Sequence, residues 1–222
     1  MRLLNILAKI VRKFNTYIMY YNKNTHQLNN STSSDRYPEI FNSVKAQINE
    51  NHKELKILSF GCSTGEECFA LRNYFKNAKI IGVDINTANL KKCTAKNRDN
   101  NTVFFKSSLD NIINNGKYDV IFAMSVLCRW PETKDCKNIE RKYPFSKFQE
   151  VVCMLNKSLK NRGLLVVFNS NYLVMDTTIH NEYETINIPI RENLEFVHKF
   201  DKNGNRLKEC EKNIFVLYKK IA

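Results

Sequence analysis

The stretch between residues 55 and 86 constrains the fold of this chain more than any other part of the sequence. Its pattern predicts an apolar strand over 56–60, a turn containing Gly61 and Gly65, a helix, and a second strand that ends on Asp84. Glycine lacks a Cβ and tolerates positive φ, so such a turn lets the backbone approach a ligand closely. An acidic side chain at the tip of the next strand is where folds of this kind bind ribose hydroxyls. The pattern therefore predicts a cleft for a nucleoside.

Short apolar runs alternate with helical patterns along the chain, which is typical of a parallel α/β sheet flanked by helices. Further strands are predicted over 79–84, 103–105, 118–124 and 164–168, and helices over 38–48, 66–75, 87–96, 109–113 and 145–159. Two last strands, over 195–200 and 213–218, flank a turn at 202–205 and predict an antiparallel hairpin that closes the sheet. The polar segment 129–143 is expected to be a loop on the substrate side of that sheet.

The composition indicates one globular α/β domain, because 43% of the 222 residues are hydrophobic and 26% are charged. The net charge of +13 favours an anionic partner such as nucleic acid or an acidic membrane surface. A lysine-biased composition explains the same charge, since the basic residues are spread along the chain. Seven cysteines without a C-x-x-C pair argue against a disulfide framework or a zinc site. We therefore expect no metal and a reducing, cytoplasmic location.

The first 52 residues are expected to form an N-terminal arm and a short helix, ahead of the main domain at 53–222. Residues 1–21 carry an apolar helical stripe with basic residues on the other faces. Lys9, Arg12 and Lys13 interrupt the stripe too often for a transmembrane segment. A helix packed on the domain, a helix on a membrane surface through residues 1–22, and a transit peptide or partner-binding helix all remain open.

The order of the predicted elements resembles class I S-adenosylmethionine (SAM)-dependent methyltransferases from about residue 55 onward. Five parallel strands followed by an antiparallel hairpin differ from a dinucleotide-binding domain, which continues with parallel units. The G-x-G-x-x-G pattern is also absent, and only Gly61 and Gly65 are present, at a spacing of four. SAM contains no phosphate, so a third glycine is not required. The resemblance implies a Rossmann-like class I methyltransferase fold with SAM as the cofactor.

The resemblance also implies a set of cofactor-binding residues at the carboxyl ends of the predicted strands. They are Gly61, Cys62, Ser63, Thr64, Gly65, Asp84, Ile85, Ser107, Ser108, Ala123 and Met124. Asp84 is expected to accept hydrogen bonds from both ribose hydroxyls, although it could instead cap the helix that begins near Asn86. Ser107 and Ser108 stand where the family has an acid or amide that reads adenine, which is a departure from the family pattern.

Two more specific resemblances rest on short sequence strings, the first of them in the loop at 61–67. Its sequence, GCSTGEE, is the string found in chemoreceptor (CheR-type) glutamate O-methyltransferases, but their C-R-N-V pattern after the fourth strand is not reproduced here. The chain is similar over most of its length to uncharacterised bacterial methyltransferase-domain proteins. That similarity rests on D-R-Y-P-E-I-F at 35–41, S-F-G-C-S-T-G-E-E at 59–67, Y-P-F-x-K-F at 143–148 and S-N-Y at 170–172. It implies a fold and a cofactor without a substrate.

Methyl transfer from a sulfonium requires an aligned nucleophile more than it requires acid–base groups. Candidates on the substrate side are Arg129, Tyr143, Asn171 and His180, each of which could equally be a surface or packing residue. We expect an enzyme that methylates a small molecule or a glycan- or lipid-linked metabolite. Methylation of a protein carboxylate or of RNA is the alternative activity, and a non-catalytic binding or scaffold protein is the alternative to an enzyme.

Overall fold

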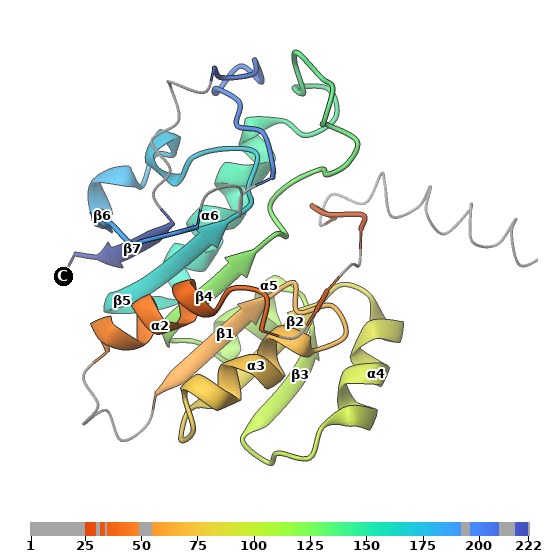
Figure 1. Ribbon diagram of the computed structural model, residues 1–222, viewed down its shortest axis with the longest axis vertical. Helices are drawn as coiled ribbons and strands as arrows, with labels where there is room; N and C mark the ends of the chain where they lie inside the picture. Colours follow the sequence, from red (N-terminus) through yellow and green to blue (C-terminus); the bar gives the residue numbers. More distant parts are fainter. Residues whose placement is uncertain are drawn as a thin grey trace, which may run out of the picture.

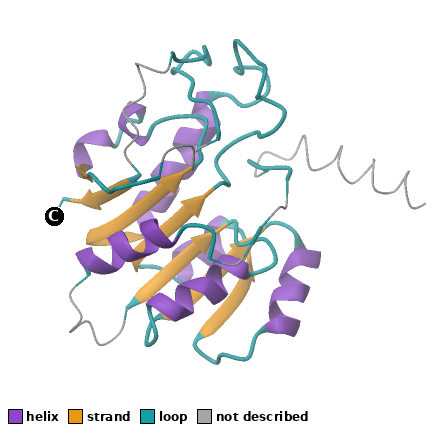
Figure 2. Cartoon of the chain, in the orientation of Figure 1, coloured by secondary structure: helices purple, strands orange, loops and turns teal. Residues whose placement is uncertain are grey.

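The computed structural model describes residues 25–29, 32–33, 35–48, 55–191, 196–208 and 216–221. These residues form a seven-stranded sheet in the order β3-β2-β1-β4-β5-β7-β6, with helices on both faces (Figure 1, Figure 2). Neighbouring strands from β1 to β5 pair in parallel, whereas β7 pairs antiparallel with β5 and with β6. The structure therefore has the Rossmann-like class I methyltransferase sheet that the sequence predicts.

The bounds of the first four strands agree with the sequence prediction to within one residue at each end. The strands are β1 (Lys56–Phe60), β2 (Lys79–Asp84), β3 (Thr102–Lys106), β4 (Tyr118–Met124), β5 (Leu159–Phe168), β6 (Tyr183–Ile186) and β7 (Leu217–Lys220). The helices are α2 (Pro38–Gln47), α3 (Glu66–Tyr74), α4 (Thr87–Lys96), α5 (Leu109–Asn114) and α6 (Phe145–Ser158), with short 3-10 turns η1 (Val174–Asp176) and η2 (His180–Glu182).

The order of the strands reverses direction at β1, which fixes where a ligand can bind. From β1 the chain moves outward to β2 and β3, and it then crosses back to place β4 on the other side of β1. Helices that leave such a pair of strands on opposite sides open a crevice at the carboxyl ends of β1 and β4. The topology thus places the expected site at the ends of these two strands.

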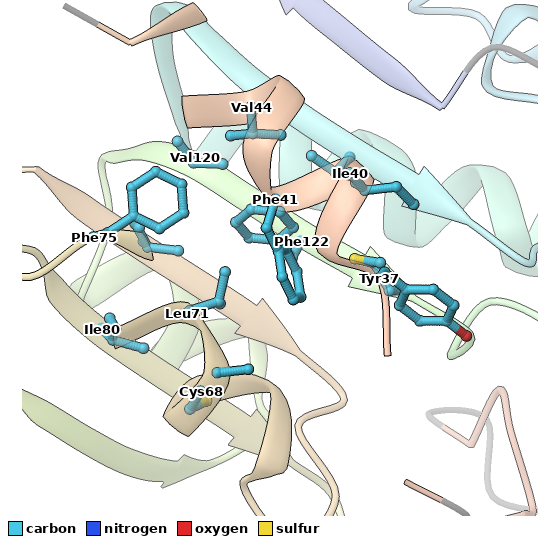
Figure 3. Packing of buried hydrophobic residues seen from close by; sticks show 14 of the residues in the cluster. Tyr37, Ile40, Phe41, Val44, Cys68, Leu71, Phe75, Ile80, Val120 and Phe122 are labelled. Atoms are coloured by element: carbon cyan, nitrogen blue, oxygen red, sulfur yellow. The ribbon is translucent and has the colours of Figure 1, made fainter. Parts of the chain in front are cut away.

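Alternating side chains along the strands build two separate cores, one on each face of the sheet. Ile57 of β1 faces the core that α2, α3 and α4 cover, while its neighbour Leu58 faces the core under α5 and α6. In Figure 3, Phe41 and Val44 of α2 lie beside Leu71 and Phe75 in the first of these cores. Complete burial of each such side chain contributes about 1.5–3 kcal/mol to stability.

Tyr37, directly before α2, lies between the core and the expected site. Tyr37 precedes Pro38, the first residue of α2, and its ring contacts Phe168 edge-on at a centroid distance of 5.1 Å. Figure 3 shows the ring at the edge of the cluster, with its hydroxyl directed away from the other labelled side chains. The ring of Tyr37 thus belongs to the core, whereas its hydroxyl lies at the carboxyl end of β4 beside Ser125.

The predicted closing hairpin is wrong in its pairing. The partner of β7 is β6, over Tyr183–Ile186, rather than a strand at 195–200. Residues 196–200 contain only an isolated bridge between Phe200 and Arg206, and residues 195 and 213–215 lie outside the described residues. The turn itself forms, because Asp201 Oδ1 accepts the backbone N–H groups of Asn203 and Asn205. Strong local turn chemistry was therefore mistaken for a connection between sheet strands.

A second difference concerns the start of β5. The strand predicted over 164–168 begins five residues earlier, at Leu159, so that Arg162 and Gly163 lie inside β5. Arg162 has a φ of 61° at a shift of register between β4 and β5. A bulge of this kind places a residue with positive φ inside a strand. The N-terminal arm predicted over residues 1–21 lies outside the described residues, and within the described part no helix is long and apolar enough to span a membrane.

Candidate functional site

A cavity lies at the carboxyl ends of β1, β2 and β4, at the position that the strand order predicts. One wall consists of residues that end or follow these strands, including Gly61, Asp84 and Met124. The other wall comes from the segments before α2, including His26 and Tyr37. Its empty volume is about 930 Å³, a figure that includes its solvent-open mouth.

The loop after β1 is folded tightly against its neighbours. Gly61 has a φ of 78°, and its N–H donates to Val83 O at 2.8 Å. A Cβ built on Gly61 would lie 2.4 Å from Cγ2 of Val126, so glycine is required both for its conformation and for the close approach. Gly65 has a φ of 95° and precedes the first residue of α3. These contacts bring the backbone of the loop to the cavity wall.

Asp84 lies at the end of β2 and connects this loop to the next one. Its Oδ2 accepts the N–H of Ser63 at 2.9 Å, and its Oδ1 accepts the N–H of Asn86 at 2.7 Å. Burial raises the pKa of the Asp84 carboxyl above its usual value. The cap of α4 is Asn86, whose side chain accepts the N–H groups of Ala88 and Asn89. Asp84 is therefore not the helix cap, and its carboxylate lines the cavity.

The predicted cofactor residues divide into two groups. Those that line the cavity are Gly61, Cys62, Ser63, Asp84, Ile85, Ser107 and Met124, whereas Thr64, Gly65, Ser108 and Ala123 lie beside them without lining it. Ser108 caps α5 by accepting the N–H of Asn111, and Ala123 is fully buried between the strands. Thr64 donates its hydroxyl to Glu66. In the second group, Ser108, Ala123 and Thr64 thus have evident local structural roles.

Two of the four predicted substrate-side residues hold the fold together behind the cavity. Arg129 is 2% exposed, and its Nη2 donates to the carbonyl oxygen of Thr25 at 2.8 Å. Its backbone N–H donates to Oδ1 of Asn171 at 2.7 Å, and Nδ2 of Asn171 donates to the carbonyl oxygen of His198 at 3.0 Å. Neither side chain lines the cavity, so both connect the loop after β4 to its surroundings.

The other two candidates separate in space. Tyr143 is fully buried, and its hydroxyl lies 2.7 Å from Nδ1 of His26, which lines the cavity. His180 lies in η2, where its Nδ1 is 2.9 Å from the carbonyl oxygen of Thr177, and it does not line the cavity. The structure thus connects Tyr143 to the cavity through a histidine other than the one expected from the sequence.

His26, Tyr37 and Glu67 were missed as site residues. Their only signals were the D-R-Y-P-E-I-F string and the second acid of GCSTGEE, and His26 stands in a polar stretch without a pattern. Burial, followed by the charges of Lys147 and Arg129, lowers the pKa of His26 to about 3. Burial raises the pKa of Glu67 to about 7, although its Oε1 accepts the Ser59 hydroxyl at 2.7 Å.

Tyr37 belongs to a hydrogen-bonded triangle at the end of β4. Its hydroxyl lies 2.9 Å from Oγ of Ser125, and Nδ2 of Asn169 donates to both oxygens at 3.1 Å. Ser125 and Asn169 have φ values of 57° and 51°, and Asp35 and Ser63 on the cavity wall have 47° and 50°. Non-glycine residues with positive φ are uncommon, and they concentrate at ligand sites that the surrounding structure holds in place.

Comparison with known proteins places the chain in a family. Residues 51–213 match the methyltransferase-domain family, whereas no curated protein matches the chain. Similar solved structures include a plantazolicin methyltransferase in complex with S-adenosylhomocysteine (SAH), at 18% identity and a TM-score of 0.44, covering 60% of this chain and 46% of that one. Another is an amino pentose methyltransferase from Micromonospora echinaspora involved in calicheamicin biosynthesis, at 12% identity and 0.44, covering 62% and 50%.

A sugar N-methyltransferase from a Streptoalloteichus species is similar at 19% identity and a TM-score of 0.42, covering 60% of this chain and 48% of that one. The chain thus spans about half the length of these solved structures. The family match covers more than half of the chain and includes β1 to β6. The sheet order and the cavity at its switch point agree with that match. The chain therefore belongs to the methyltransferase-domain family.

Proposed function

We propose that this protein methylates a small molecule, or the small headgroup of a glycan- or lipid-linked metabolite, inside the cavity at the ends of β1, β2 and β4. The observation that carries this proposal is the second wall of the cavity. Residues of the segments before α2, including His26, Gln27 and Arg36, lie opposite the strand ends. An acceptor atom must therefore enter between two walls, which suits a small group better than a folded partner surface.

The polar groups of the cavity fit the parts of the cofactor. We assign Asp84 to the ribose, because an ionised carboxylate offers only acceptors and the ribose hydroxyls are donors. Ile85 and Ser107 line the same region and would flank the adenine. Ser63 and its neighbours in the loop after β1 would approach the ribose and the methionine chain with backbone groups. These assignments use only residues that line the cavity. Thr64, Gly65 and Glu66 do not line it and belong to the structure of the loop.

Two charged side chains fit the amino acid part of the cofactor. Arg36 and Glu67 both line the cavity, and Arg36 is close enough for its charge to oppose the rise in the pKa of Glu67. A guanidinium binds a carboxylate through two parallel hydrogen bonds, and a carboxylate accepts hydrogen bonds from an ammonium group. We therefore assign Arg36 to the α-carboxylate and Glu67 to the α-ammonium.

SAM supplies an electrophilic methyl group bound to a positively charged sulfur. The chain's own contribution is to hold the acceptor in line with that methyl group and to exclude water. Positioning of two reactants can by itself provide about 7–11 kcal/mol of the reduction in barrier. The triangle of Tyr37, Ser125 and Asn169 fixes the wall where the acceptor would enter, and buried Phe60 and half-buried Val126 keep that region apolar.

Calorimetric titration tests the cofactor assignment. We expect SAM and SAH to bind the full chain, and we expect Asp84→Asn to weaken SAH binding. Asp110→Asn is a matched control, because Asp110 is an exposed aspartate in the first turn of α5. An absence of binding at hundreds of micromolar SAH would contradict the proposal.

The acceptor class is tested by transfer of a tritiated methyl group from SAM into cell extract, followed by separation of protein, RNA and small molecules. We expect the label in the small-molecule fraction. Label in protein would instead support the carboxylate methylation that GCSTGEE suggests. Label in RNA would support the alternative that the charge of +13 suggests.

A further inference from the structure

Residues 25–29 are fixed against the loop that follows β4 by three polar contacts from consecutive residues. The carbonyl oxygen of Thr25 accepts Nη2 of Arg129 at 2.8 Å, and Nε2 of Gln27 donates to Sγ of Cys128 at 3.0 Å. Between them, Nδ1 of His26 lies 2.7 Å from the hydroxyl of Tyr143. Thr25 and His26 are both buried. The segment is thus held in one place, and His26 is held with it.

His26 belongs to the wall of the cavity. It is 4% exposed and lines the same cavity as Gly61 and Val126. The ring meets that of Tyr143 edge-on, with the centroids 5.7 Å apart and an angle of 85° between the planes. Because Nδ1 is engaged by Tyr143, the second ring nitrogen, Nε2, is the one that remains for a ligand. Residues 26 and 143 therefore form a side-chain pair at the wall.

The groups around His26 keep the imidazole neutral. Burial is the main cause of its low pKa of about 3, and the positive charges of Lys147 and Arg129 lower it further. Burial also raises the pKa of Tyr143 well above its usual value and that of Cys128 to about 12, so both remain protonated and uncharged. A neutral imidazole has one donor and one acceptor nitrogen. His26 is therefore neutral at physiological pH.

We propose that His26 is a catalytic residue, whose Nε2 accepts the proton that a neutral hydroxyl of the acceptor loses as it is methylated. This inference rests on the proposed function. We assign to His26 the tautomer in which Nδ1–H donates to the hydroxyl oxygen of Tyr143, 2.7 Å away, and Nε2 carries no proton. The reaction is then an O-methylation that yields an ether. The positive charges of Lys147 and Arg129 near His26 disfavour a protonated amine at the same place.

The transfer forms an O–C bond and an N–H bond, and it breaks the C–S bond of SAM and the O–H bond of the acceptor. A lone pair of the hydroxyl oxygen forms the new bond to the methyl carbon, and the carbon–sulfur bond of SAM breaks. Its electron pair stays on sulfur, which gives SAH. The electron pair of the O–H bond stays on the ether oxygen while the proton moves to Nε2 of His26. The resulting imidazolium donates its Nδ1–H to Tyr143 as before, and it returns the proton to solvent when the products leave.

A base as weak as His26 is sufficient for this step. The acidity of a hydroxyl proton rises by many orders of magnitude as the oxygen forms its bond to the methyl carbon. The base therefore receives the proton late in the reaction and does not have to ionise the free alcohol. Positioned proton acceptors contribute about 10²- to 10⁴-fold to reaction rates. The low basicity also ensures that the proton is released again in each turnover.

Nitrogen NMR of the side chains in the full chain bound to SAH tests the tautomer directly. The His26 signals are assigned by their loss in His26→Gln. We expect a neutral ring between pH 5 and pH 8, protonated at Nδ1 and bare at Nε2. A ring protonated at Nε2, or one that titrates within that range, would overturn the inference. This measurement does not require the acceptor.

Transfer of labelled methyl to the small-molecule fraction tests the role in catalysis. We expect His26→Gln and His26→Ala to lower the rate by about 10²- to 10⁴-fold, while their affinity for SAH stays within about threefold of wild type. His180→Gln is the matched control and keeps the wild-type rate. The product label is expected to resist alkali, as an ether does.

The outcomes separate this inference from the function on which it rests. An unchanged rate in His26→Gln, or an alkali-labile ester label, overturns the inference and leaves the methyltransferase site in place. A wild-type protein that binds no SAH, or that binds it and labels no small molecule, overturns the proposed function and the inference together.

Discussion

The two ends of the cavity are built in different ways. Apart from Arg36, the end that we assign to the cofactor takes its residues from the βαβ stretch 55–86 and the loop after β3, at the carboxyl ends of parallel strands. The opposite end joins segments far apart in the chain: His26 with Tyr143, and Tyr37 with Ser125 and Asn169, at separations of 88 to 132 residues. A topological rule places the first set, whereas individual side-chain contacts place the second.

This difference has a functional consequence. Residues at strand ends keep their places as long as the sheet forms, so a common cofactor can be retained while the rest of the chain changes. His26 and Tyr37 depend on a few polar contacts, and replacement of those contacts would reshape the acceptor end without disturbing the sheet. We therefore expect substitutions at the two ends to separate cofactor binding from acceptor use.

The largest effect is expected from Gly61→Ala at the cofactor end. The added Cβ would meet Val126 at 2.4 Å in a backbone conformation with a φ of 78°. Strain and overlap together predict a loss of about 3 kcal/mol or more in unfolding free energy and a loss of SAH binding. Urea unfolding and calorimetry measure both. Gly116→Ala is the control, with no contact closer than 3.3 Å, and a Gly61→Ala protein of normal stability would contradict the prediction.

Asp84→Asn tests the assignment of Asp84, at the end of β2, to the ribose of the cofactor. The amide keeps one acceptor oxygen but loses the negative charge and the second acceptor oxygen of the carboxylate. A hydrogen bond to a charged group contributes about 1.5–3 kcal/mol. We expect SAH affinity to fall about 10- to 100-fold in calorimetry. An affinity within twofold of wild type would show that the ribose binds elsewhere.

The pH dependence of stability tests the burial of His26. The folded-state pKa of about 3 lies below the usual value of 6.5, so the unfolded chain binds the proton first and stability falls as the pH decreases below 6.5. His26→Gln removes this term. The stability of wild type relative to the variant should decline by about 2.5 kcal/mol between pH 6 and pH 4. Parallel curves for the two proteins in urea unfolding would refute it.

Glu67 gives a smaller pH effect on cofactor binding. Its folded-state pKa of about 7 lies above the usual 4.5, so the carboxyl is largely protonated at pH 6. An ammonium group prefers the ionised form, so SAH should bind about tenfold more tightly at pH 8 than at pH 6. Glu67→Gln should abolish the difference, and so should replacement of SAH by 5′-methylthioadenosine, which lacks the amino acid. A pH dependence that persists in Glu67→Gln would disprove the assignment.

The smallest effect is expected from Tyr37→Phe at the acceptor end. The substitution removes one corner of the triangle and leaves Ser125 and Asn169 bonded to each other. We expect a loss of about 1 kcal/mol in unfolding free energy and little change in SAH affinity. Tyr74→Phe is the control, because the Tyr74 hydroxyl donates to Asp35 at an exposed site. A large loss of SAH affinity in Tyr37→Phe would contradict the prediction that the acceptor end does not take part in cofactor binding.

Hydrophobic periodicity predicted most of the sheet, because it reports which side of a strand or helix is buried. The bounds of β1, β2, β4 and α4 agree with the sequence prediction residue for residue. The errors fall where turn chemistry competes with pairing. The turn at 202–205 was mistaken for a sheet hairpin, and β6 was missed because Tyr183–Ile186 is short and lies at the edge of the sheet beside β7.

The sequence by itself determined the strand–turn–helix–strand unit that forms the half of the cavity we assign to the cofactor. A strand, a tight turn with Gly61 and Gly65, and an acid at the next strand end are local features, and their backbone requirements are legible in the residues. Only the tertiary structure decided the acceptor half. His180 stands near the strand ends in sequence but does not line the cavity, whereas His26 lies far away in sequence, lines the cavity and contacts the hydroxyl of Tyr143. Long-range hydrogen bonds between buried side chains leave no periodic trace in the chain that forms them.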